Sequence, residues 1–173
     1  IAKAGWEMTK PLIFNESFVP KSWGPVVQPP QPWVEGNAVR GPDGEVYNLL
    51  RLENGWSVKN PIGNKAILLR APHATAPQEF VEIVDMPGGS SKFTVRRDPV
   101  SGRYLSLTNN VTDVKACASA RNVLVLVSSP DLRNWPIAKT LPATDEGVPE
   151  ARTLYPSDPA DRLACAETSG RCA

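Results

Sequence analysis

The sequence predicts an all-β fold that is built from repeated units of four antiparallel strands. Proline gives the first indication, because 18 of the 173 residues are proline, about twice the usual fraction. A proline inside a helix removes a backbone donor and clashes with the preceding turn, so a helical bundle is excluded. The other two indications are an internal repeat and a series of short apolar runs bounded by turn residues.

The internal repeat relates residues 33–85 to residues 91–141. Both units contain the same succession of apolar runs, polar loops and turns. Four pairs of landmark residues lie about 56 positions apart, namely Val39 and Val95, Tyr47 and Tyr104, Ile67 and Val123, and Phe80 and Trp135. A unit of four strands that recurs at such a period is typical of a blade of a β-propeller. The predicted fold is therefore a partial β-propeller.

The first predicted blade, residues 33–85, contains four short runs with strand character. They are Asn37–Arg40, Val46–Leu52, Ala66–Arg70 and Phe80–Val84. Pro42, Asp43 and Gly44 separate the first two runs. Proline presets φ and glycine tolerates a positive φ, so these residues predict a tight hairpin.

The second predicted blade, residues 86–141, has the same organisation. Its four runs are Lys92–Arg96, Arg103–Thr108, Asn122–Ser128 and Pro136–Thr140. The third run contains five consecutive apolar residues, Val123–Val127, as expected of a strand that is buried on both faces. Turn residues at 98–102 and 129–132 separate the runs.

The flanking segments do not form complete blades in this interpretation. In residues 1–32, the run Trp6–Leu12 is expected to be the last strand of a preceding blade, followed by a Pro-rich connection. Residues 142–173 show no period of two and are expected to form a non-propeller tail, either disordered or with a short helix. About two and a half blades are too few to close a ring, since propellers have about four to eight. The chain is therefore expected to be an internal segment of a longer protein.

Charge and hydropathy exclude two classes of partner. Nineteen basic residues face 18 acidic ones, and a net charge of +1 leaves no electrostatic footprint for nucleic acid. No apolar run approaches the roughly 20 residues that span a bilayer, so no membrane span is expected.

The cysteines give no metal or cofactor site. Cys117, Cys165 and Cys172 form no C-x-x-C pair and have no nearby histidine, so no metal ion and no other cofactor are expected. Cys165 and Cys172 either pair in an oxidising compartment or stay free thiols. The interpretation leans towards a secreted or periplasmic location.

Several phrases in the sequence carry a family likeness. They are Trp33–Asn37, Gly88–Phe93, Arg96–Tyr104, Arg121–Leu124 and Ser128–Trp135. In this order and spacing, the chain from residue 6 to residue 141 resembles bacterial sialidase-like proteins of the propeller glycoside hydrolase class. The ending Ser-x-Asp-Leu-x-x-Trp is also similar to that of five-bladed glycosidases acting on arabinan, xylan and fructan.

The resemblance implies where a site would lie. Propeller enzymes of these families place their sites around the axis, at the starts of the innermost strands. That position falls on Glu35 and Asn37 in the first blade, and on Ser91 and Lys92 in the second. Glycoside hydrolysis needs a general acid and a second charged or nucleophilic group, which is a tyrosine in sialidases.

Each candidate residue has a functional and a structural interpretation. Glu35 is either an acid, a base or a hydrogen-bond partner of a sugar hydroxyl, or else an exposed carboxylate at a strand start. Lys92 either binds substrate or forms a plain salt bridge, and Trp33 either stacks on a sugar or packs between blades. Arg51 and Arg121 either contribute to the arginine cluster that binds the sialic-acid carboxylate in sialidases, or pair with Asp and Glu.

Two functions follow from these observations. The first is a sialidase-like glycoside hydrolase segment that acts on a glycan, with weak or no catalysis as an isolated chain because the pocket lacks its other walls. The alternative is a non-catalytic carbohydrate- or protein-binding propeller module. In both cases an unclosed ring exposes strand edges, which favours self-association.

Overall fold

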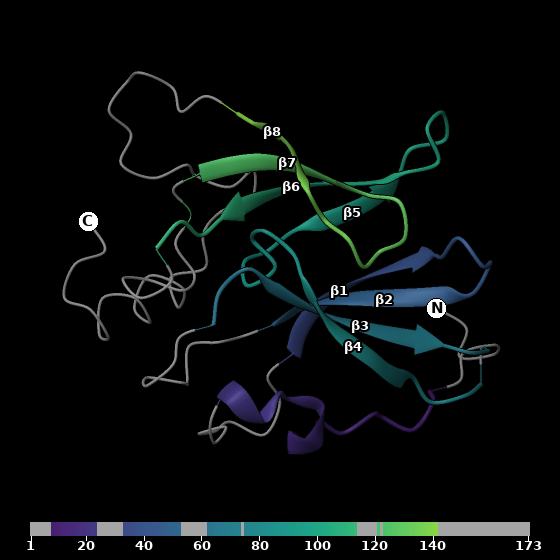
Figure 1. Cartoon of the computed structure of the whole chain (residues 1–173). Coiled ribbons are helices and arrows are strands. Elements are labelled where there is room, and N and C mark those ends of the chain that lie inside the picture. Colours follow the sequence, from purple (N-terminus) through teal and green to yellow (C-terminus); the bar gives the residue numbers. More distant parts are fainter. Residues whose placement is uncertain are drawn as a thin grey trace, which may run out of the picture.

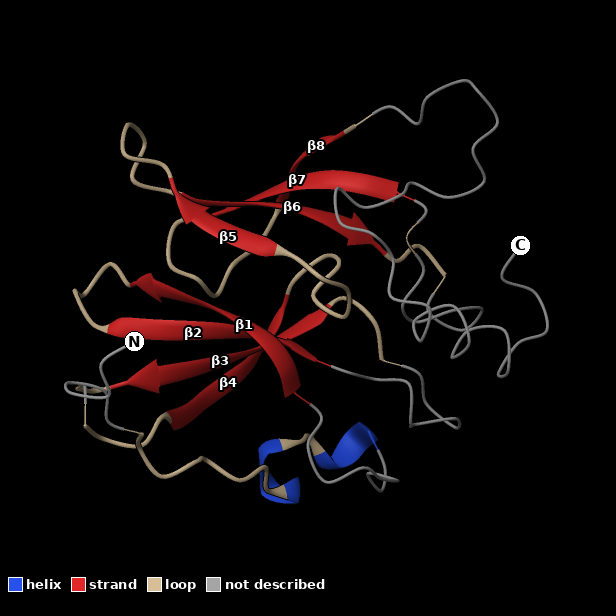
Figure 2. Ribbon diagram, turned by 180° about the vertical axis from the view of Figure 1, so that it is seen from behind, coloured by secondary structure: helices blue, strands red, loops and turns tan. Residues whose placement is uncertain are grey.

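The computed structural model describes residues 8–23, 33–52, 62–73, 75–113, 121 and 123–141 of the chain. These residues form an all-β structure of two four-stranded antiparallel sheets, together with two short 3₁₀ helices (Figures 1 and 2). Within these ranges there is no helix long and apolar enough to cross a membrane.

Each sheet is a meander in which consecutive strands are neighbours. The first sheet consists of β1 (Trp33–Arg40), β2 (Val46–Leu52), β3 (Lys65–Ala71) and β4 (Glu79–Asp85). The second consists of β5 (Thr94–Arg97), β6 (Tyr104–Asn110), β7 (Val123–Ser129) and β8 (Ile137–Thr140). The eight predicted strands and their antiparallel order are confirmed, and the two sheets do not close into a ring.

The first hairpin forms where the turn residues predict it. Gly44 has a φ of 87°, which a residue with a side chain rarely adopts. The Asp43 carboxylate accepts hydrogen bonds from the Glu45 amide at 3.1 Å and from the Tyr47 hydroxyl at 2.7 Å. Local hydrogen bonds of this kind fix the turn and, through it, the register of β1 and β2.

The two faces of the first sheet are buried against different parts of the chain. One face packs on the second sheet through an apolar cluster. Its fully buried members include Leu49 and Leu68 from the first sheet and Val95, Tyr104 and Val127 from the second. The other face contributes Leu50, Leu52, Ile67 and Leu69 to a second cluster, against which Leu12, Trp23 and Trp33 pack.

The registers define how the two sheets correspond. Arg40 pairs with Val46 and Ile67 with Leu50, whereas Arg97 pairs with Tyr104 and Val125 with Thr108. The ends of the hairpins therefore correspond at separations of 57 and 58 residues, not at about 56. The equivalent of Tyr47 is then Leu105 instead of Tyr104, and because side chains alternate between faces, this one-residue difference exchanges the faces. The equivalent of Ile67 is Val125 instead of Val123.

This correspondence shows which faces of the two sheets pack against each other. The Ile67 face of the first sheet is covered by N-terminal residues, and the equivalent Val125 face of the second sheet is covered by the first sheet. Non-equivalent faces therefore meet between the sheets, and β1 and β5 lie next to each other (Figure 1).

The expectation of a strand before the first blade is wrong for the residues described. Residues 8–12 form no strand, and the 3₁₀ helices η1 (Glu16–Phe18) and η2 (Lys21–Trp23) follow them. Leu12 packs on the face of the first sheet instead of extending its edge. A strand needs a partner for its backbone groups, and a segment lying across a sheet face has none there.

Several other expectations concern residues that the structure does not describe. Trp6, most of the Pro-rich connection, the three cysteines and the tail from residue 142 lie outside the described residues. The expectations made for them remain predictions.

Candidate functional site

Glu35 lies in an irregularity of β1 at the junction of the two sheets. Trp33 pairs with Leu52 and Gly36 pairs with Leu50, so Val34 and Glu35 together oppose the single residue Arg51. Two residues opposite one is a β-bulge, which bends the strand and redirects a side chain. The bulge is the local reason that the Glu35 side chain meets Arg51.

Glu35, Arg51 and Lys92 form the charged group that we call the Glu35 cluster. Arg51 Nη1 lies 3.5 Å from Glu35 Oε2, and Lys92 Nζ lies 3.4 Å from Glu35 Oε1. The side chains are 53% exposed for Glu35, 31% for Lys92 and 5% for Arg51. The cluster thus presents a half-exposed carboxylate between two cations, one of them buried.

Arg51 is anchored by β1 and by the segment that joins the two sheets. Its Nε donates a hydrogen bond of 3.0 Å to the carbonyl oxygen of Ser90, which lies between β4 and β5. A buried guanidinium is costly unless its charge and donors are satisfied, so the ion pair with Glu35 and the hydrogen bond to Ser90 stabilise its position. Arg51 therefore has little freedom to move when a ligand approaches Glu35.

The turn that carries Ser90 needs two glycines. Gly88 has a φ of 75°, and a Cβ at Gly89 would lie 2.5 Å from the carbonyl oxygen of Lys65. Only glycine allows this close approach of two backbones. The segment consequently packs closely against the start of β3. Ser91 is fully buried there, and its hydroxyl has no hydrogen-bond partner.

Asn37 joins the two sheets directly. Its Nδ2 donates to the carbonyl oxygen of Phe93 at 3.2 Å, and its Oδ1 accepts from the amide of Val95, also at 3.2 Å. The side-chain amide thereby takes the place of a backbone group beside β5. Because Phe93 follows Lys92, this contact also sets the position of Lys92 relative to Glu35.

Like Asn37, Asn64 joins separate segments through its side-chain amide, and the sequence did not predict this role. Its Oδ1 accepts from the amides of Gly88 at 2.8 Å and Val111 at 2.9 Å, and its Nδ2 donates to the Val111 carbonyl at 2.8 Å. Asn64 has a φ of 57°, which asparagine tolerates better than most residues. The Gly63-Asn64 pair before β3 was the available signal, since such pairs mark turns.

Of the other two candidates, Trp33 lies outside the Glu35 cluster and Arg121 lies just before a strand of the second sheet. Trp33 lies on the opposite face of the first sheet, with its ring 5.4 Å from that of Phe14 and 6.3 Å from that of Phe18. Arg121 precedes β7, whose first residue Val123 pairs with Asn110. Glu35 forms its ion pairs with Arg51 and Lys92.

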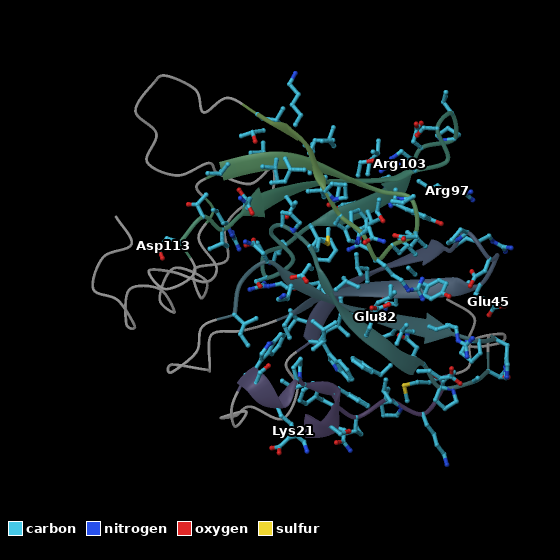
Figure 3. All side chains as sticks on the ribbon, in the orientation of Figure 1. Lys21, Glu45, Glu82, Arg97, Arg103 and Asp113 are labelled. Atoms are coloured by element: carbon cyan, nitrogen blue, oxygen red, sulfur yellow. The ribbon has the colours of Figure 1, made fainter. Side chains whose placement is uncertain are left out.

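A second polar group links the sheets nearer the hairpin of β1 and β2. Arg133 Nε lies 2.7 Å from Glu82 Oε1, and the Arg133 guanidinium lies 5.8 Å from the centre of the Tyr47 ring. The hydrogen bond to Asp43, together with burial, raises the pKa of Tyr47. In Figure 3, Glu82 lies in the first sheet, Arg97 lies in the second, and Arg103 lies just before β6. These contacts hold the sheets together and leave the Glu35 cluster at the other end of β1.

Asp131 fixes the turn that positions Arg133. Burial raises the pKa of Asp131, but hydrogen bonds from the amides of Asn134 and Arg133 outweigh burial and lower it to about 2. The carboxylate also accepts from the Asn134 side chain at 2.6 Å. The turn is therefore built around an ionised aspartate.

The described part of the chain offers no obvious metal centre. Among these residues there is no group of three or more His, Cys, Asp or Glu side chains that could hold a metal ion. The chemistry available at the Glu35 cluster is that of a carboxylate, a guanidinium and an ammonium.

Comparisons with known proteins give no relative that could assign a role to these residues. No protein-family model matches the chain, and no curated protein or solved structure is significantly similar to it.

Proposed function

We propose that the chain is a segment of a sialidase-like or related β-propeller glycoside hydrolase, and that the Glu35 cluster binds a glycan. The observation that carries the proposal is the position of Glu35. A bulge places its half-exposed carboxylate between Arg51 and Lys92 where the two sheets meet. Bulges are over-represented beside active sites, where they redirect a side chain.

The stacking of the sheets supports the propeller part of the proposal. Rotation of identical blades about an axis brings non-equivalent faces together, which is the relation between the two sheets described above. The face of the second sheet that corresponds to the buried Leu49 face carries Leu105, Leu107, Leu124 and Leu126. Leu107 is 43% exposed. An apolar face of this kind suits a further sheet of the same design.

The chemistry of the Glu35 cluster suits sugar recognition. A carboxylate accepts hydrogen bonds from hydroxyl groups, and the guanidinium and ammonium donate to hydroxyl or carboxylate oxygens. The three groups carry a net charge of +1, which favours an anionic sugar over a cationic ligand. In this proposal Glu35 and Lys92 contact the glycan, and Arg51 holds Glu35 in place.

Hydrolysis by the 173-residue chain alone is not expected. A glycosidase needs a second catalytic group across the scissile bond. The ion-paired carboxylates Glu79, Glu82 and Asp85 lie on β4, whereas Glu35 lies on β1 at the other edge of the sheet. The proposal therefore places the second catalytic group in other blades.

The test compares Glu35→Gln with the unchanged protein. We expect the chain alone to release no aryl group above background from aryl sialosides, galactosides, xylosides and arabinosides. In a longer parent protein with such activity, Glu35→Gln should lower turnover at least about 100-fold if Glu35 is a catalytic acid or base. Near-normal turnover would remove Glu35 from the mechanism, and activity of a monomeric isolated chain would refute the segment proposal.

A non-catalytic binding module is the second candidate, and the pairing of Glu35 favours it. Both oxygens of Glu35 already face cations, an arrangement suited to a fixed recognition group. For a binding module, Glu35→Gln should weaken glycan retention on an array, and no aryl glycoside should be cleaved by the parent protein. Arg70→Gln is the matched control, since Arg70 forms its ion pair with Glu79 at the far end of β3.

A further inference from the structure

A groove lies on the face of the first sheet that is turned away from the second sheet. Its volume is about 210 Å³. The N-terminal segment forms one side with Lys10 and Leu12, and the sheet forms the floor and the other side with Trp33, Asn48, Leu69 and Gln78. The Glu35 cluster lies on the opposite face, so the groove is a separate feature.

The polar part of the groove is a pair of side-chain amides. Asn48 Nδ2 donates a hydrogen bond of 3.2 Å to Gln78 Oε1. This bond uses one donor and one acceptor and leaves the Asn48 carbonyl oxygen and the Gln78 NH₂ group for another molecule. Lys10 adds three donors at the rim. A donor and an acceptor thus lie next to each other beside an aromatic ring.

The walls of the groove are held in place before any ligand arrives. The Trp33 ring meets the Phe14 ring edge-on at 5.4 Å, and Phe18 lies 6.3 Å from it. Asn48 rests against Gly36, where a Cβ would lie 2.4 Å from Asn48 Oδ1. Pre-organised side chains lose little conformational entropy on binding.

We propose that this groove binds a single pyranose ring of a carbohydrate. Sites for drug-sized ligands have volumes of about 300–1,000 Å³, so the smaller groove suits one ring. A pyranose has an apolar face of C–H groups that matches Trp33 and Leu69, and adjacent hydroxyls that match the Asn48 and Gln78 amides. An aliphatic ligand would leave the Asn48 carbonyl oxygen and the Gln78 NH₂ group without partners on desolvation, which costs binding free energy.

The experiment is a two-dimensional ¹H–¹⁵N NMR titration of the full chain with methyl glycosides of glucose, galactose and N-acetylglucosamine. Open-chain xylitol, which has hydroxyls but no ring face, is the control ligand. We expect at least one glycoside to shift the Trp33 indole and the Gln78 side-chain amide resonances at millimolar concentration, and xylitol to shift neither.

Two variants make the result specific. Gln78→Glu keeps the size of the side chain and the acceptor for Asn48 but removes the NH₂ donors, and should weaken binding at least about fivefold. Lys139→Gln changes an exposed residue of β8 in the second sheet and should leave this binding unchanged. Lys10→Met tests the rim without touching the packed part of the groove, and should weaken binding less than Gln78→Glu.

The proposal is overturned if no glycoside shifts the Trp33 and Gln78 resonances, or if Gln78→Glu binds as the unchanged chain does. Shifts confined to Ser91 and Lys92 would also overturn it, while supporting sugar binding at the Glu35 cluster. The two proposals can therefore fail independently.

Discussion

Asn37 is predicted to be the main polar link between the two sheets. Replacing it with alanine removes two hydrogen bonds of 3.2 Å, to the Phe93 carbonyl and the Val95 amide. Each is expected to contribute about 1 kcal/mol, and leaving two partly buried backbone groups unpaired adds a similar cost. The expected loss in the free energy of unfolding is about 3 kcal/mol, a large share of a typical total of about 5–15 kcal/mol.

The assay is equilibrium unfolding in urea followed by tryptophan fluorescence. With a slope of about 2 kcal/mol/M, Asn37→Ala should lower the midpoint by about 1.5 M. Asn48→Ala is the matched control, because Asn48 makes one side-chain hydrogen bond within the first sheet, and its midpoint should fall by less than about 0.5 M. Equal shifts for the two variants would refute the role assigned to Asn37.

Two further predictions concern the turns that position the sheets. Gly88→Ala should cost at least about 3 kcal/mol, because φ is 75° and the new Cβ would lie 1.9 Å from Thr108 Oγ1; Gly44→Ala, with φ at 87° and open space around it, should cost about 1 kcal/mol. Comparable urea midpoints for these variants would contradict the proposed close approach. For Asp131, whose pKa falls from 3.8 to about 2 on folding, about 2 kcal/mol of stability is present above pH 4 and is lost as pH falls through 2. The difference in urea midpoint between the unchanged chain and Asp131→Asn should therefore be largest at pH 5.5 and shrink towards pH 2, and a constant difference would exclude the ionised carboxylate as its cause.

Strand positions could be predicted because alternation and turn chemistry are local properties. Pro42, Asp43 and Gly44 specify their hairpin without help from distant residues, and the apolar run Val123–Val127 specifies a strand. The expectation that this strand is buried on both faces is wrong, because Val125 and Val127 are fully buried whereas Leu124 and Leu126 on the other face are only partly buried. It was harder to predict which faces of the two sheets correspond, because the turn between β5 and β6 is longer than the turn between β1 and β2. Aligning the two tyrosines shifts the correspondence by one residue and exchanges the faces.

The candidate site could be predicted only in part for a related reason. Its position at the start of β1 and just before β5 placed Glu35 and Lys92 near each other, and the structure brings them within 3.4 Å. The participation of Arg51 depends on the bulge in β1, and the role of Asn64 depends on contacts with residues 24 and 47 positions away. Neither a bulge nor a long-range side-chain clamp leaves a periodic trace in the sequence.

Because the first sheet is covered on both faces, its central strands are expected to be the last part of the molecule to unfold. Amide hydrogens of β2 and β3 lie between two apolar clusters, whereas all four residues of β8 are exposed. Amide exchange in native proteins is slowest where opening requires global unfolding and fastest where edges fray. Exchange should therefore begin at β8 and end in β2 and β3, so that the outer edge of the second sheet frays while the first sheet still persists.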